Sequence, residues 1–142
     1  MKISTKGRYA LRYMVDLAQH PQESVSLKES AQRLDVSMKY LEQIVALLVK
    51  QALVNGSRGA KGGYRLTKEP YQYSAFDIIE VMEGSLSPVP CLDNDPIGCE
   101  KADDCPTIHL YQKLKHSIES VLKTTTLSDL CDSPGVMVGA LT

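Results

Sequence analysis

Apolar residues recur at helical spacing in three segments of the first third of the chain. One stripe runs between Lys6 and His20, and a shorter one runs from Leu27 to about Leu34. A capping box precedes the second stripe, because Ser26 is followed three residues later by Glu29. Ser37 is expected to cap a third helix, whose buried positions are Leu41, Ile44, Val45 and Leu48. The pattern therefore predicts three successive amphipathic helices.

The apolar period changes after Gln51. Leu53 and Val54, and then residues 64–66, have the short apolar pattern of strand ends. The basic segment 55–63 between them is rich in glycine, which is typical of a β-hairpin turn. Three helices followed by a hairpin form the element order of a winged helix-turn-helix. The expected fold class is thus mainly α with a small β-hairpin wing.

The second half of the chain contains two more predicted helices separated by a long connection. A helix begins after Ser74, with Phe76 and Ile79 expected to face inward, and ends at Gly84. The helix from Pro106 to about Lys123 carries a near-heptad seam of apolar side chains, and such a seam is expected to pack against another part of the protein or a second copy. Its members are Tyr111, Leu114, Ile118 and Val121. One further helical turn is expected from Thr126 to Leu130.

These boundaries suggest a division of the chain into four parts. We expect a DNA-binding domain at 1–83, a cysteine-containing sensor loop at 84–105, a dimerisation helix with a C-terminal turn at 106–132, and a flexible tail at 133–142.

Charge is distributed unevenly along the chain. Residues 1–70 contain 12 lysines and arginines against 6 acidic residues, whereas residues 71–142 contain 4 against 11. A basic half joined to an acidic half suggests that the first half binds a polyanion such as DNA. The alternative is that the two halves have solvated surfaces with unrelated charge biases, which would give the same numbers of charged residues.

The third helix and the hairpin supply the candidate DNA-reading side chains. A recognition helix presents the side chains near its N-terminus to base edges in the major groove, and a basic wing can enter the minor groove. The alternative is that the polar positions of the helix are simply its solvated face. The candidates are Ser37, Lys39, Tyr40, Glu42 and Gln43 on the helix, and Arg58 and Lys61 on the wing.

Three of the four cysteines, Cys91, Cys99 and Cys105, lie within one acidic connection. No apolar run is long enough to span a membrane and no signal peptide is recognisable, so we expect a cytoplasmic protein. In that compartment cysteines are more often thiols or metal ligands than disulfides. An iron–sulfur cluster, zinc or another metal, and a thiol switch all remain open. Cys131 is expected to be a small packing residue.

Three sequence blocks resemble the Rrf2 family of winged-helix regulators. They are Lys6-Gly7-Arg8-Tyr9-Ala10, Tyr40-Leu41-Glu42-Gln43, and Arg58-Gly59-Ala60-Lys61-Gly62-Gly63-Tyr64. The resemblance extends from Met1 to about Leu130 and implies a winged helix with a long C-terminal dimerisation helix. It also implies that Arg58 and the five helix candidates named above contact DNA.

Sensing members of the family hold an iron–sulfur cluster with three cysteines. The fourth ligand is a histidine in some members and an N-terminal aspartate in others, and the aspartate position is Arg8 here. The resemblance therefore implies a cluster, of the 2Fe–2S type, held by Cys91, Cys99 and Cys105. The first gap between the cysteines is longer here, and Ile108 occupies the position of the histidine. His109, one residue later, is the candidate fourth ligand. Other members lack the three cysteines and still repress transcription.

The expected protein is a homodimeric repressor that binds a near-palindromic operator in double-stranded DNA. Its affinity would depend on the cluster, and it would govern iron–sulfur biogenesis or cysteine and sulfur metabolism. The alternative is a cluster-free repressor of cysteine metabolism that a partner protein or a thiol switch controls. The sequence has no recognisable nucleophile–base pair or cofactor loop, so we do not expect an enzyme.

Overall fold

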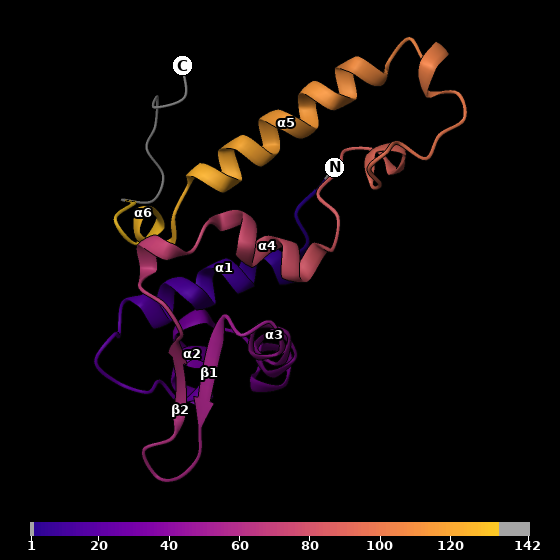
Figure 1. Ribbon diagram of the computed structural model, residues 1–142. Helices are drawn as coiled ribbons and strands as arrows, with labels where there is room; N and C mark the ends of the chain where they lie inside the picture. Colours follow the sequence, from indigo (N-terminus) through magenta and orange to yellow (C-terminus); the bar gives the residue numbers. More distant parts are fainter. Residues whose placement is uncertain (1, 134–142) are drawn as a thin grey trace.

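The computed structural model describes residues 2–133, and most of the expected tail, from residue 134 onward, lies outside this range. The main elements are the helices and the hairpin drawn in Figure 1: α1 (Thr5–Ala18), α2 (Leu27–Leu34), α3 (Met38–Lys50), β1 (Val54–Ser57), β2 (Gly63–Leu66), α4 (Ala75–Glu83), α5 (Ile108–Thr124) and α6 (Leu127–Cys131). Short 3-10 turns are η1 (Pro70–Gln72), η2 (Pro90–Leu92) and η3 (Ala102–Asp104). The predicted fold class, mainly helical with one hairpin, is confirmed.

Hydroxyl side chains begin most of the helices. Ser4, Ser26, Ser37 and Ser74 each accept a hydrogen bond from a backbone N–H in the first turn of the following helix. The predicted capping box of Ser26 and Glu29 is present. Such caps satisfy N–H groups that have no partner within the helix. For α1–α4, therefore, local chemistry explains where each helix starts.

The wing is more extensively paired than the sequence suggests. The antiparallel register joins Val54 to Leu66 and continues to Ser57 opposite Gly63, beyond the expected strand ends. Val25, which precedes α2, also pairs with Tyr64 through two backbone hydrogen bonds of 3.0 and 2.8 Å. A Cβ at Gly63 would lie 2.5 Å from the backbone of Val25. A side chain at this position would therefore push the wing away from the helices.

The core lies between α1, α2, α3 and α4, and α6 contributes to it. Leu41, Ile44, Val45 and Leu48 are buried as expected. In α4 the buried apolar side chains are Ala75, Ile78 and Ile79, whereas Phe76 is only half-buried beneath Lys123. The expectation that Phe76 points into the core was wrong because α5 returns along that side of α4.

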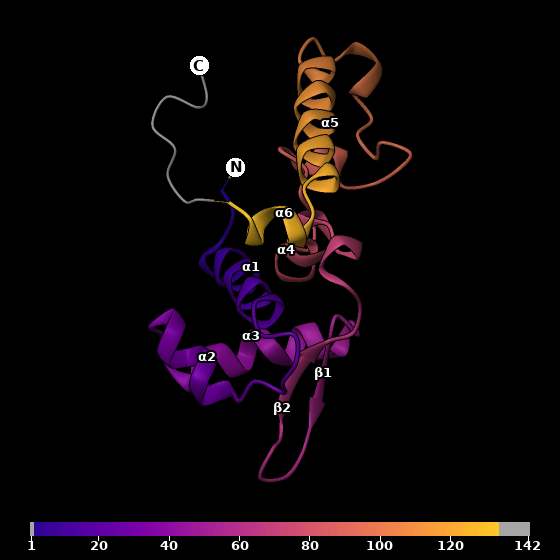
Figure 2. The same cartoon turned by 90° about the vertical axis from the view of Figure 1, so that its left-hand side faces the viewer.

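The long helix α5 extends away from the core on the side opposite the wing, as both views show (Figures 1 and 2). The chain then returns, and α6 packs against α1 and η1. Leu127 is fully buried, and its N–H donates to the Tyr73 carbonyl at 2.9 Å. Within the described part of the chain, no helix is long and apolar enough to cross a bilayer.

Candidate nucleic-acid interface and cysteine loop

The start of α3 exposes four of the five predicted helix residues. Ser37, Lys39, Glu42 and Gln43 are exposed, and Tyr40 is half-buried. The Ser37 hydroxyl accepts from the Tyr40 N–H at 3.1 Å, so it also caps the helix. Because the opposite face of α3 is buried in the core, these polar side chains form its outward surface.

Tyr40 connects α3 to α1 through an aromatic contact. Its ring meets the Tyr9 ring edge to face, with 6.0 Å between the centroids. The Arg12 guanidinium lies 5.0 Å from the centroid of the Tyr9 ring. Edge-to-face pairs restrain the rings in both position and orientation. The position of α1 therefore contributes to the placement of the first turn of α3.

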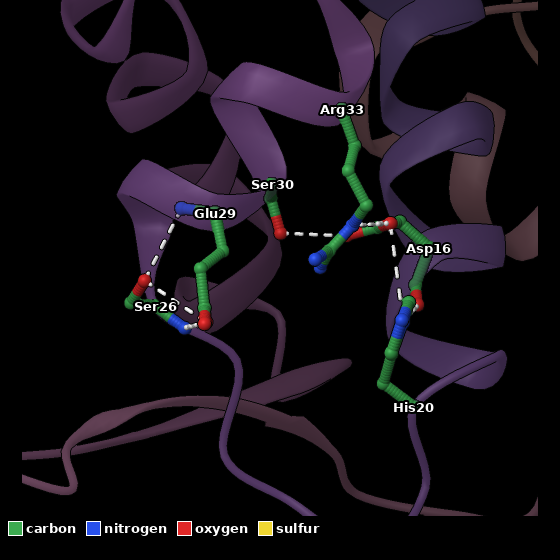
Figure 3. Close-up of polar contacts among 6 residues, drawn as sticks. All are labelled: Asp16, His20, Ser26, Glu29, Ser30 and Arg33. Carbon is green, nitrogen blue, oxygen red and sulfur yellow. Dashed lines mark hydrogen bonds and ion pairs between the residues drawn. The ribbon is translucent and has the colours of Figure 1, made fainter.

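A buried carboxylate joins α1 to α2 (Figure 3). Asp16 accepts two hydrogen bonds from Arg33, at 2.7 and 3.0 Å, and one from the Ser30 hydroxyl at 2.7 Å. Burial alone would raise the pKa of Asp16, but the hydrogen bonds from Arg33 and Ser30 and the Arg33 charge outweigh it. The pKa consequently lies below its ordinary value. Asp16 therefore remains ionised at neutral pH and fixes the helix that precedes α3.

The tip of the wing presents the two predicted basic residues. Arg58 and Lys61 are both exposed in the segment that joins β1 to β2. The Gly62 N–H donates to the Gly59 carbonyl at 2.9 Å, which closes the turn between them. The wing and α3 lie at the end of the molecule away from α5 (Figure 1). The arrangement can bring a polar helix and a basic loop to the same ligand.

The first part of the cysteine loop is attached to α5. Leu92 is buried, and its carbonyl accepts from the Ser87 hydroxyl at 3.0 Å and from Lys115 Nζ at 2.9 Å. Cys91 precedes Leu92 and is exposed. The loop is therefore packed against the long helix at one point rather than extended into solvent. No sequence signal pointed to Lys115, because its partner is a backbone carbonyl distant in the sequence.

The predicted metal ligands are not gathered into one site. Cys99 and Cys105 are half-exposed, His109 is exposed in the first turn of α5, and none of the four cysteines is in a disulfide. Among residues 2–133, no group of three or more His, Cys, Asp or Glu side chains is placed to hold a metal ion. Soft thiol donors suit a cluster chemically, but this arrangement does not fit one.

The thiol of Cys105 lies next to hydrogen-bonding groups at the start of α5. Its Sγ lies 3.4 Å from the Thr107 hydroxyl. That hydroxyl, followed by the backbone N–H groups of Thr107 and Ile108, lowers the pKa of Cys105. The thiolate is therefore more accessible at neutral pH than in an ordinary cysteine, which suits both metal binding and thiol chemistry.

Comparison with known proteins identifies the family. A family model described as Rrf2, iron-dependent transcriptional regulator, matches residues 3–133. The HTH-type transcriptional regulator CymR of Bacillus subtilis is 45% identical over 132 residues, which are 92% of this chain and 89% of that protein.

Solved structures give the same family. The structure of CymR, described as the global cysteine regulator of B. subtilis, matches with a TM-score of 0.77 and 42% identity, over 92% of this chain and 96% of that one. The structure of T. potens IscR matches with a TM-score of 0.73 and 43% identity, over 92% and 85%. The chain is thus a transcriptional regulator rather than an enzyme, and it belongs to the Rrf2 family of winged-helix regulators.

Proposed function

We propose that this regulator is a cytoplasmic repressor that reads double-stranded DNA with α3 and the wing. The observation that best supports this is the exposed polar face of α3 beside a basic, glycine-rich wing tip. In the proposal, Glu42 accepts from a cytosine amino group and Gln43 pairs with adenine. Lys39 and Ser37 hold phosphates or base edges, Tyr40 supports them, and Arg58 and Lys61 enter the minor groove.

The test of this interface is a selection of bound sequences from random DNA, followed by titration of the selected operator. Glu42→Ala should relax discrimination at one base pair per half-site by about 1–3 kcal/mol. Glu80→Ala, which removes an exposed glutamate from α4, is the matched control and should bind as the wild type does. An unchanged sequence preference in Glu42→Ala would remove Glu42 from the proposed reading set.

We further propose that two copies associate through α5. Leu110, Leu114 and Val121 are exposed on one side of this helix, with exposed fractions of 56%, 38% and 64%. A groove of about 520 Å³ adjoins Val121 and is also bordered by Ile3, Glu83, Ile118 and neighbouring residues. A two-fold dimer would require a near-palindromic operator. A selected motif without two-fold symmetry would contradict this part of the proposal.

For regulation, we propose a 2Fe–2S cluster held by Cys91, Cys99 and Cys105, with His109 as the fourth ligand. Support comes from three thiols on one segment and from the family described as iron-dependent. The loop would have to rearrange, because the described residues do not bring the ligands together. The regulated genes would serve iron–sulfur biogenesis or cysteine and sulfur metabolism.

The second candidate is a cluster-free repressor of cysteine metabolism, controlled by a partner protein or a thiol switch. Two observations favour it: the dispersed cysteines, and 45% identity to CymR, whose solved structure is described as that of a global cysteine regulator. It uses the same DNA-reading surface and differs only in the signal.

The absorbance spectrum of anaerobically purified protein separates the two candidates. A cluster gives sulfur-to-iron charge-transfer bands above about 300 nm, which Cys91→Ser, Cys99→Ser and Cys105→Ser should each abolish. Cys131→Ser is the matched control and should retain them. His109→Ala should shift the bands and shorten their lifetime, whereas His116→Ala should not. A colourless wild type after anaerobic reconstitution would favour the cluster-free repressor.

A further inference from the structure

The N-terminus of α1 has an incomplete local cap. Ser4 is the N-cap, and its hydroxyl oxygen accepts from the Gly7 N–H at 3.0 Å. In a capping box, a glutamate or glutamine at the third helical position would accept from the N-cap N–H in return. Here that position is Gly7, which has no side chain.

Glu83 supplies the missing acceptor from 79 residues further along the chain. Its Oε1 accepts from the Ser4 N–H at 2.8 Å and from the Ser4 hydroxyl at 2.6 Å. A Cβ at Gly7 would lie 2.5 Å from this oxygen, so glycine is what makes room for the carboxylate. The negative charge also suits the positive end of the α1 dipole, whereas it opposes the dipole of α4, which Glu83 ends.

Glu83 stands directly before the cysteine loop. Ser85 donates a hydrogen bond to Asp93, which closes residues 85–93 into one turn that contains Cys91. Lys115 and the buried Leu92 attach this turn to α5. Only Gly84 separates this turn from Glu83, so a displacement of the turn relative to α5 would start close to the carboxylate that caps α1.

At its other side, α1 contacts the proposed recognition helix. Tyr9 lies in the second turn of α1 and meets Tyr40 in the first turn of α3. A continuous path thus runs from the loop along the backbone to Glu83, across the hydrogen bonds to Ser4, and along α1 to the contact with α3. Such a series carries coupling only if a change at one end alters the other, which an experiment can measure.

We propose that Glu83 is a positioning residue that couples the cysteine loop to DNA recognition by capping α1 across the chain. The proposal rests on the proposed function, in which α3 reads DNA and the loop carries the signal. The competing explanation is that Glu83 only stabilises α1, as any capping residue does. The two differ in whether the loop responds when the cap is changed.

The chain offers a variant that separates these explanations. Gly7→Glu combined with Glu83→Ala restores a capping box within α1 and removes the connection to α4. Glu83→Ala removes two of the three atoms nearest to a Cβ at position 7, and the third, Cγ2 of Ile3 at 3.0 Å, belongs to a side chain that has to shift by a few tenths of an ångström. Glu80→Ala, one turn earlier on α4, is the matched control because it removes an exposed glutamate of the same helix.

Amide hydrogen exchange of the full-length, DNA-free protein gives the first readout. Glu83→Ala should speed exchange about fivefold, the effect of losing one cap, in residues 5–9 and also in residues 85–93. The double variant should restore protection of residues 5–9 only. Loop protection that is unchanged in Glu83→Ala, or restored in the double variant, would overturn the proposal. Glu80→Ala should match the wild type.

Operator titration gives the second readout. Lys115→Met, which releases the Leu92 carbonyl, should change the operator Kd about fivefold in the wild-type background and less than about twofold in the double variant. Equal changes in both backgrounds, or none in either, would refute coupling through Glu83. If the wild type bound no operator at all, the proposed function would fail, while the exchange data would still decide the role of Glu83.

A single substitution covers the case in which the double variant does not fold. Ser4→Ala removes the hydroxyl that donates to Glu83 and caps the Gly7 N–H, keeps the backbone N–H donor to Glu83, and leaves the α4 side untouched. Exchange should then rise in residues 85–93 as well as in α1. Faster exchange in α1 alone would show that Glu83 only stabilises α1, and it would overturn the proposal.

Discussion

Two buried tyrosines show how differently one hydroxyl can act in this core. Tyr73 donates to the Leu53 carbonyl at 2.8 Å and accepts from the N–H groups of Thr67 and Lys68 at 2.8 and 3.0 Å. The Tyr13 hydroxyl is equally buried but has no hydrogen-bond partner among the described residues. Burial, followed by the nearby Tyr64 and Asp16, raises the pKa of Tyr13, which therefore stays neutral.

The two tyrosine-to-phenylalanine substitutions should accordingly have opposite effects on stability. Tyr73→Phe leaves two N–H groups without this partner and the Leu53 carbonyl with only the Thr67 hydroxyl, 3.4 Å away, and should lower the free energy of unfolding by about 1–3 kcal/mol. Tyr13→Phe removes an unsatisfied polar atom and should raise it by up to about 1 kcal/mol. Urea denaturation of both variants measures the difference. A similar loss in both would show that the Tyr13 hydroxyl is bonded in solution.

The ion pair of Asp16 should make stability depend on pH in the acid range. Its folded-state pKa lies below the ordinary value of 3.8, so ionised Asp16 stabilises the fold above that value, and this stabilisation is lost as the pH falls through the folded-state pKa. Asp16→Asn should lower the free energy of unfolding by about 1–2 kcal/mol at pH 7. The loss is limited because Arg33 is partly solvated. The difference in the free energy of unfolding between this variant and the wild type should become smaller only below about pH 4.

Thermal unfolding at a series of pH values measures this effect. Asp35→Asn is the matched control, because Asp35 is exposed at the end of α2 and should leave the pH profile unchanged. A stability gap between Asp16→Asn and wild type that stayed constant down to pH 3 would refute the assignment of acid sensitivity to this carboxylate.

Among the elements, α5 is divided into two faces. Tyr111 and Ile118 of the expected seam are half-buried toward the chain itself, whereas Leu114 and Val121 are exposed together with Leu110. The exposed stripe is therefore the better target for a test of self-association, since changing it leaves the contacts of α5 with α4 in place.

Leu114→Asp with Val121→Asp should convert the proposed dimer into a folded monomer. Burying two carboxylates in an apolar contact is costly, and loss of the dimer should remove most of the operator affinity. Sedimentation measures the mass, and circular dichroism verifies the fold. Gln112→Asp with Ser120→Asp introduces the same charge at exposed polar positions and should remain dimeric. A dimer that persists in the stripe variant would place the interface elsewhere.

At the scale of the whole molecule, the separation of charge predicts the salt dependence of DNA binding. The basic residues lie mainly in residues 1–70, the part that forms α1–α3 and the wing. Operator affinity should fall steeply with salt, because phosphate contacts release counterions. Lys61→Ala should reduce the slope of log K against log salt by about 1. Lys123→Ala, which removes a lysine paired with Glu119 on α5, should leave the slope unchanged.

Local sequence was sufficient for most of the fold. Apolar periodicity and hydroxyl caps placed α1–α4 to within a few residues, because each signal is contained within one or two helical turns. The same locality explains the outward positions of Lys39, Glu42 and Gln43, which follow once the buried side of α3 is known. What DNA these residues contact, and which group the cysteines hold, stays a prediction.

The sequence by itself determined the helices, the hairpin, the basic half and the family, since these depend on short-range patterns and on motifs. Only the tertiary structure decided that Leu127 enters the core, that Phe76 does not, that Val25 extends the wing, and that Glu83 completes the cap of α1. The physical reason is that each of these contacts joins segments distant in the sequence. The residue types alone do not say which carboxylate, carbonyl or apolar face will be adjacent after folding.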